Sequence, residues 1–122
     1  MVAKQESCVR QTGAKSTLNK VAELNDTFRK TCSGGTLMAT PGVIALGWAA
    51  LPQIVEALRG FDQFTHDNDP YDEHDFGALE WNGQRLFWKI DCYDPDLRFG
   101  SADPADPTVT ARLLTIMLAE EY

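Results

Sequence analysis

The sequence contains no apolar stretch long enough to cross a membrane. Its longest apolar run extends from Val43 to Leu51 and already contains a glycine, whereas a membrane helix needs about 20 apolar residues. The first residues, MVAKQESCVRQTGAK, also lack the apolar segment of a signal peptide. We therefore expect a cytoplasmic protein with no membrane partner. Residues 1–15 are polar and without periodicity, so we expect them to be a flexible or weakly anchored N-terminus.

Cysteine is scarce, and its spacing matches neither a disulfide scaffold nor a zinc ribbon. The three cysteines are Cys8, Cys32 and Cys92, an odd number without a C-x-x-C pair. A disulfide framework would need an even number, and a zinc ribbon would need such pairs. Free thiols fit the reducing environment of the cytoplasm.

The common catalytic and metal-binding motifs are missing. The chain has no G-x-S-x-G, no P-loop and no G-x-G-x-x-G, so neither a nucleophile elbow nor a phosphate-binding loop is indicated. Asp67 and Asp69 offer oxygen ligands for calcium, but Asp72 occupies the position where a calcium loop needs glycine. His66 and His74 match no H-E-x-x-H pattern. We expect no catalytic residue, no metal and no cofactor.

Basic residues are few, and they are unevenly placed. The chain has 11 Lys and Arg against 18 Asp and Glu, a net charge of −7 and a pI near 4.6. Fourteen of the acidic residues and only four of the basic ones lie in residues 60–122. Nucleic acids and anionic membranes are themselves polyanions, so this balance excludes unaided binding to either.

Hydrophobic periodicity predicts two helices and one strand in the first half. The stripe of Leu18, Val21, Ala22 and Phe28 indicates a helix over 17–31, ended by Ser33-Gly34-Gly35. The run 36–40 is a strand candidate, stopped by Pro41-Gly42. A second helix begins near Leu51 with Pro52 in its first turn and ends at Gly60. The residues between, 43–46, are ambiguous.

A β-hairpin is the clearest local signal in the chain. Two β-rich runs, 76–81 and 84–93, flank Asn82-Gly83, the preferred pair for a type I′ turn because both positions need positive φ. Counting outward from this turn places His74 opposite Asp91. Because opposed residues share a face, the register predicts one core face and one wetter face. The core face carries Leu79, Leu86, Trp88 and Ile90, and the wetter face carries Glu80, Arg85, Lys89, His74 and Asp91.

The C-terminal segment is predicted to be a third helix. Residues 94–107 form a long loop rich in Asp and Pro, after which Asp106 serves as N-cap and Pro107 as the first helical residue. Val109, Leu113, Ile116 and Met117 give an apolar stripe at helical spacing. The predicted fold class is α+β: a single domain over 16–122, with three helices packed on a small antiparallel sheet built around the 76–93 hairpin.

Acidic side chains gather on both sides of this hairpin. Six lie between Asp62 and Asp75, and five lie between Asp91 and Asp106. Carboxylates two residues apart on extended backbone are about 6.6 Å apart, which is of the same order as the charge spacing along a nucleic acid. Nearby aromatic residues can anchor an interface. The candidate partner-binding residues are Asp67, Asp69, Tyr71, Asp72, Glu73, Tyr93, Asp94, Asp96 and Phe99.

Other readings of the same residues stay open. The carboxylates can form a solvated face with no partner. A cross-strand pair of His74 and Asp91 with Asp75 beside it can support acid–base chemistry, which gives a metal-dependent hydrolase or nuclease-like enzyme as the alternative. A third alternative is an assembly protein that forms a homodimer through its helices.

The central stretch also resembles a known family. The residues NDPYDEHDFGALEWNGQRLFWKIDCYDPDLRFGSADPAD (68–106), flanked by AELNDTFRK (22–30) and TIMLAEEY (115–122), resemble a small uncharacterised bacterial family carried by plasmids, phages and chromosomes. The resemblance implies no activity and no catalytic residue, but it implies a setting. Small acidic proteins of mobile elements are often inhibitors of host defence, including anti-CRISPR proteins. We therefore expect a non-enzymatic inhibitor that occupies a basic groove of a nucleic-acid-binding protein or CRISPR effector complex, without binding nucleic acid directly.

Overall fold

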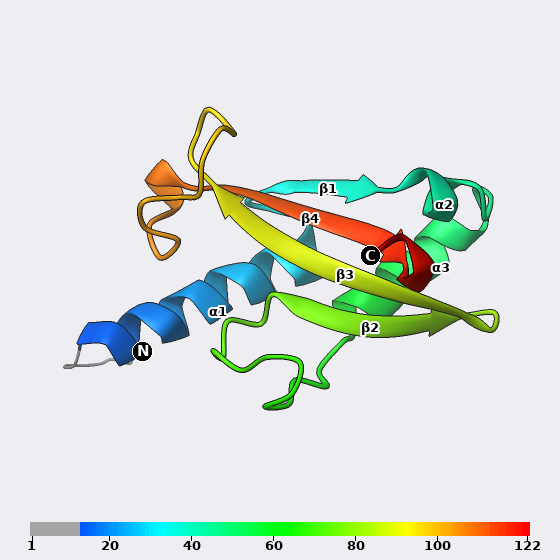
Figure 1. The fold of residues 1–122 in the computed structure, drawn as a ribbon, viewed down its shortest axis with the longest axis horizontal. Helices are drawn as coiled ribbons and strands as arrows, with labels where there is room; N and C mark the ends of the chain where they lie inside the picture. Colours follow the sequence, from blue (N-terminus) through cyan, green and yellow to red (C-terminus); the bar gives the residue numbers. More distant parts are fainter. Residues whose placement is uncertain (1–12) are drawn as a thin grey trace.

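A computed structural model describes residues 13–122 of the chain, and the side chains from residue 20 onward (Figure 1). The predicted weak anchoring of the N-terminus concerns mainly residues 1–12, which lie outside the described residues, as does Cys8. Residues 13–15 already belong to the first helix. None of the helices described over 13–122 has the length and apolar character that crossing a membrane requires.

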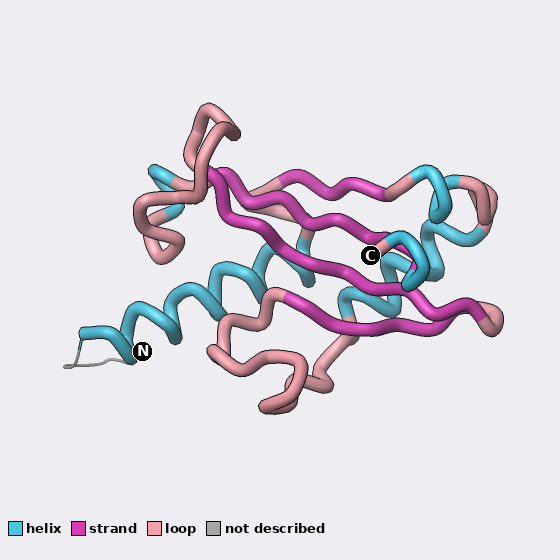
Figure 2. Tube along the Cα trace, viewed as in Figure 1, coloured by secondary structure: helices cyan, strands magenta, loops and turns pink. Residues whose placement is uncertain are grey.

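The described chain forms three α-helices, two short 3₁₀ turns and one four-stranded sheet (Figures 1 and 2). The strand order is β1-β4-β3-β2, with β1 parallel to β4 and the other neighbours antiparallel. The α+β class with three helices on a small sheet is therefore confirmed, with a mixed rather than purely antiparallel sheet. In chain order the elements are α1 (Gly13–Thr31), β1 (Thr36–Ala39), α2 (Pro41–Ile44), α3 (Ala50–Arg59), β2 (Phe76–Trp81), β3 (Gln84–Tyr93), η1 (Pro107–Val109), β4 (Ala111–Leu118) and η2 (Ala119–Glu121).

The hairpin has the predicted turn and register. Asn82 and Gly83 both have positive φ, 51° and 80°, as a type I′ turn requires. Phe76 pairs with Lys89 and Trp81 with Gln84, so all six pairs of β2 with β3 follow the count outward from the turn. The predicted core side chains, Leu79, Leu86, Trp88 and Ile90, are all buried.

The predicted C-terminal helix is wrong, because the segment forms strand β4 in the centre of the sheet. Asp106 and Pro107 do begin a helical turn, but it is the 3₁₀ turn η1 of three residues. In β4, burial alternates from residue to residue, with Arg112, Leu114 and Ile116 facing the core. The run is apolar at nearly every position, so helical and strand periods both fit it, and pairing with β1 and β3 decides the outcome.

The third helix is instead the short α2, which begins at Pro41, predicted only as the stop of the strand, and includes the first two of the ambiguous residues 43–46. Thr40 caps it through a hydrogen bond from the Val43 N–H to the threonine Oγ1, and Pro41 occupies the first turn, where a missing N–H has no cost.

Helices α1 and α3 cover one face of the sheet (Figure 1). The core lies between them, where Phe28 of α1 and Ile54 and Leu58 of α3 pack with Trp88 and Leu114 of the sheet. On the other face, side chains such as Phe87 and Lys89 are only half-buried. Within residues 13–122 this outer face is covered only in part, by η2 and Tyr122.

Candidate functional site

The loop between α3 and β2 is organised by one buried carboxylate, Asp69. Its side chain is only 2% exposed and accepts hydrogen bonds from the backbone N–H of Glu73 at 2.9 Å and of His74 at 3.2 Å. Asp72 and His74 both have positive φ, 56° and 54°, a strained conformation for residues other than glycine. The Asp69 carboxylate compensates for that strain by binding the N–H groups that the turn points inward.

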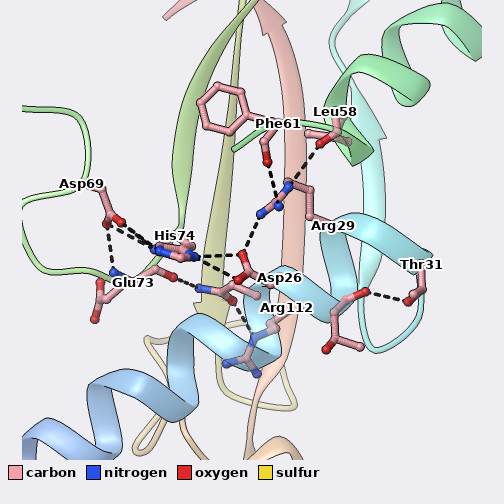
Figure 3. A network of polar contacts seen from close by, with 11 residues as sticks. Asp26, Arg29, Thr31, Leu58, Phe61, Asp69, Glu73, His74 and Arg112 are labelled. Carbon is pink, nitrogen blue, oxygen red and sulfur yellow. Dashed lines mark hydrogen bonds and ion pairs between the residues drawn. The ribbon is translucent and has the colours of Figure 1, made fainter. Parts of the chain in front are cut away.

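His74 fastens the same loop to α1 (Figure 3). Its Nδ1 lies 3.0 Å from both carboxylate oxygens of Asp26, and its Nε2 lies 3.7 Å from Asp69 Oδ2. The ring stacks on Phe64, with centroids 4.0 Å apart and planes 2° from parallel. Both ring nitrogens thus face carboxylates of the chain itself.

The predicted cross-strand pair of His74 with Asp91 is therefore wrong. Regular pairing of β2 with β3 stops at Phe76, and the last bond of the ladder runs from the Ile90 N–H to the Asp75 carbonyl at 2.8 Å. The positive φ of His74 then turns the chain away from β3 and toward α1.

Two buried arginines hold this region together from inside (Figure 3). Arg29 donates to Asp26, and Arg112 donates through Nε to Asn25 Oδ1 at 2.8 Å. Asn25 in turn donates to the Glu73 carbonyl at 2.9 Å, and Arg112 also donates to the Pro104 carbonyl. Both guanidinium groups are buried, and Arg29 also forms an ion pair with the partly exposed Asp26 at 2.8 Å.

A group of carboxylates lies on the 61–75 loop and on the neighbouring strand β3. We call it the acidic flank, and it comprises Asp67, Asp72, Glu73, Asp75 and Asp91. Asp75 and Asp91 line one hollow with Asp67 and another with Glu73, whereas Asp72 lies on the side of the loop near Glu23 and Asp26 of α1. Burial raises the pKa of Glu73, and the nearby charges of Asp75 and Asp69 raise it further. Burial likewise raises the pKa of Asp75, followed by the charges of Asp69 and Asp91. Glu73, Asp75 and Asp91 therefore lie close enough for their charges to repel one another.

Among the residues whose side chains are described, one basic side chain forms an ion pair with the acidic flank. Lys89 Nζ lies 3.2 Å from Asp91 Oδ2. Over the residues whose side chains are described, no other lysine or arginine nitrogen lies within 4.0 Å of the flank carboxylates. Described cations therefore neutralise only one of its five charges.

The structure brings together some of the predicted partner-binding residues and separates others. Asp67, Tyr71 and Asp72 are exposed and Glu73 is half-buried, all on the 61–75 loop. Asp69 belongs to the same loop but is buried, so the expectation that it offers its charge to a partner is corrected to a structural role.

Of the remaining predicted residues, Tyr93 is the last residue of β3, and Asp94, Asp96 and Phe99 lie on the loop that follows it. This loop projects from the opposite side of the sheet end (Figure 2). The Asp94 carboxylate accepts the Arg98 N–H at 3.0 Å and so shapes its own loop. The expectation that the two acidic groups meet holds for Asp91, which lies beside Asp67, Glu73 and Asp75. It does not hold for Asp94 and Asp96, because β3 pairs with β4 and carries its following loop away from β2.

Asn25, Asp26 and Arg29 were not anticipated as part of this region, although a signal was present. They stand one and four residues apart on α1, beside the apolar positions Val21 and Phe28, and Asn25 and Arg29 are each 1% exposed. Polar residues on the buried side of a helix need partners, so this spacing indicates a polar contact with another element.

Two further observations concern the side chains that metal binding and nucleophilic chemistry would use. Among them, no three His, Cys, Asp or Glu residues are grouped so that they could hold a metal ion. Burial raises the pKa of the Cys92 thiol, which keeps it in the less nucleophilic protonated form.

The acidic flank makes stability depend on pH. Because the folded-state pKa values of Glu73 and Asp75 are raised, folding favours their protonated forms. Ionisation of these two carboxyls therefore destabilises the folded state. The destabilisation begins as the pH rises above their ordinary pKa values of 4.5 and 3.8, and it is complete once the pH exceeds the raised pKa values. The double variant Glu73→Gln/Asp75→Asn is therefore expected to have a higher Tm than wild type at pH 7, with the difference shrinking toward pH 4.

Thermal unfolding followed by circular dichroism checks this expectation at pH 4, 5.5 and 7. The control is Glu56→Gln, at an exposed carboxylate of α3 outside the flank. A gain in Tm that is the same at all three pH values would contradict the electrostatic origin.

Comparison with known proteins gives one match. The family described as "Protein of unknown function (DUF3768)" matches residues 39–121, which include α3, the whole sheet apart from β1 and the complete acidic flank. Neither the curated proteins nor the solved structures yield a match. Since the matched segment spans more than half of the chain, the protein belongs to the DUF3768 family.

Proposed function

We propose that this chain is a non-enzymatic binding protein whose acidic flank docks into the basic, nucleic-acid-binding groove of a partner protein. The observation that carries the proposal is the group of five carboxylates on the 61–75 loop and the adjacent strand β3, with which, among the residues whose side chains are described, only one lysine or arginine, Lys89, forms an ion pair. A surface of this kind complements a groove built to hold phosphates.

The interior of the protein supports this reading. The 61–75 loop and its neighbours are held in place by hydrogen bonds of Arg29, Arg112 and His74. The loop is therefore held in one conformation, and little ordering entropy is lost when it binds. A preorganised charged surface raises the association rate more than it raises the affinity of any single contact.

The partner we propose is a host defence complex that binds nucleic acid, such as a CRISPR effector complex, encountered in the cytoplasm. The charge pattern supports a basic groove, and the resemblance of residues 68–106 to a family of mobile elements supports the defence setting. His74 has both ring nitrogens beside carboxylates, so the geometry favours binding over the hydrolase alternative.

Charge reversal on the acidic flank tests the proposal. Tagged wild type and the double variant Asp67→Lys/Asp72→Lys are each used to capture proteins from a bacterial lysate, and the captured proteins are identified by mass spectrometry. The variant is expected to capture at least about tenfold less of a nucleic-acid-binding protein, since like charges across an interface repel. Capture by wild type is expected to fall steeply as the salt concentration rises.

The matched control is Glu56→Lys/Glu80→Lys, which changes the net charge equally at two exposed carboxylates outside the flank and outside the predicted partner-binding residues. It is expected to retain most of the capture. Equal losses in both variants would show that total charge, and not the acidic flank, governs binding, and would contradict the proposal.

A further inference from the structure

A groove lies where the acidic flank meets the uncovered face of the sheet. Its volume is about 470 Å³. Carboxylates from three segments enter it: Asp67 from the loop, Asp75 just before β2 and Asp91 from β3. The groove is also lined by the rings of Phe76 and Tyr122 and by the side chain of Lys89.

The aromatic wall of this groove is a compact cluster on the outer face of the sheet. The centroid of Phe76 lies 5.3 Å from that of Phe87 and 5.7 Å from that of Tyr122, and the Phe87 and Tyr122 centroids are 5.4 Å apart. Tyr122 is nevertheless 74% exposed. Such an exposed ring, supported from below by two others, offers a rigid surface for a flat group.

The same cluster already accommodates a guanidinium group of the chain itself. The Cζ atom of Arg85 lies over the ring of Phe87, 5.6 Å from its centroid. This contact is a cation–π interaction at the far side of the cluster from the carboxylates. It shows that these rings are accessible to a planar cation from solvent.

The charge in the groove is not balanced by its own lysine. Lys89 pairs with Asp91, which leaves Asp67 and Asp75 facing the groove without a described lysine or arginine within 4.0 Å. A second cation would therefore find free carboxylate oxygens on one side and an aromatic surface on the other.

We propose that this groove receives an arginine side chain of the partner, with the guanidinium lying against the aromatic rings and donating hydrogen bonds to the carboxylates. The proposal rests on the proposed function and names the point of contact. Arginine fits better than lysine, because its planar fork can stack on a ring and bind a carboxylate through two N–H groups at once. Basic nucleic-acid-binding grooves are rich in this residue.

Two fluorescently labelled peptides test the proposal, one of nine arginines and one of nine lysines. Their equal charge separates guanidinium recognition from general attraction. Fluorescence anisotropy with the full chain is expected to show about two- to fivefold tighter binding of the arginine peptide, which is the size of an exposed cation–π contact. Tyr122→Leu is expected to abolish this preference while leaving binding of the lysine peptide unchanged.

The matched control is Tyr71→Leu, which removes a similarly exposed tyrosine that lies outside the groove. It is expected to keep the preference for arginine. Equal binding of the two peptides by wild type would overturn the proposal that the groove receives an arginine, and so would a preference for arginine that survives Tyr122→Leu. Neither result would contradict the proposed function. If neither peptide binds and Asp67→Lys/Asp72→Lys captures as much partner as wild type, both proposals fail.

Discussion

Replacing Arg29 with methionine is expected to lower the free energy of unfolding by about 3–5 kcal/mol, the cost of breaking a buried ion pair on one side. The guanidinium is 1% exposed and donates to the Leu58 carbonyl at 3.2 Å, to the Phe61 carbonyl at 3.0 Å and to Asp26 at 2.8 Å. The Leu58 carbonyl lies in the last turn of α3 and also accepts the Phe61 N–H at 3.2 Å, so Arg29 supplies a second donor to it. Without Arg29, α1 loses its polar connection to the end of α3, and these acceptors lose a donor while remaining in the interior.

Chemical denaturation at pH 7 measures this loss. Arg29→Lys keeps the charge but cannot reach three acceptors at once, so it is expected to lie between wild type and Arg29→Met. The control Lys30→Met removes an exposed cation from the neighbouring position of α1 and is expected to change stability by less than about 0.5 kcal/mol. A cost for Arg29→Met within about 1 kcal/mol would contradict the role given to the buried arginine.

The second large effect is expected at Asp69. Replacement by alanine removes the acceptor for the partly buried N–H groups of Glu73 and His74, and a loss of about 1–3 kcal/mol follows from leaving such groups unpaired. Partner binding is expected to fall as well, although Asp69 itself is buried, because the Asp72–Asp75 segment loses the contact that holds its positive φ values.

Asp69→Asn retains one side-chain oxygen and is expected to lose less stability than Asp69→Ala. Asp67→Ala, two residues away and exposed, is the matched control, and it is expected to weaken partner binding without a measurable change in stability. An Asp69→Ala protein with the stability of wild type would refute the assignment of this carboxylate to the fold of the loop.

Local signals in the sequence were enough to predict the hairpin and the helices α1 and α3. Asn82-Gly83 determines the turn because few other residue pairs adopt two positive φ values, and every pair of β2 with β3 follows from it. Local residues also predict the end of α3 at Gly60 and the strand that follows Gly35. Each depends on residues that are neighbours in the chain.

Elements that depend on distant parts of the chain could not be predicted in this way. The segment 111–118 is a strand because it lies between β1 and β3, and its apolar residues also fit a helical stripe. The third helix expected there is absent, while α2 forms at residues where periodicity was ambiguous.

The candidate site shows the same division. The excess of carboxylates in residues 60–122 is visible in the composition, but its division between two loops follows from the sheet order. The pairing of His74 with Asp26 joins residues 48 positions apart. The burial of Asp69 depends on a turn whose positive φ values occur at Asp72 and His74 rather than at glycine.

The most direct test of the central claim is a competition titration between this chain and nucleic acid for one captured partner. The account predicts mutually exclusive binding: the apparent Kd of the chain for the partner rises in proportion to the concentration of added nucleic acid, with no ternary complex in size-exclusion chromatography. A stable complex that contains chain, partner and nucleic acid together, with an unchanged Kd, would contradict it.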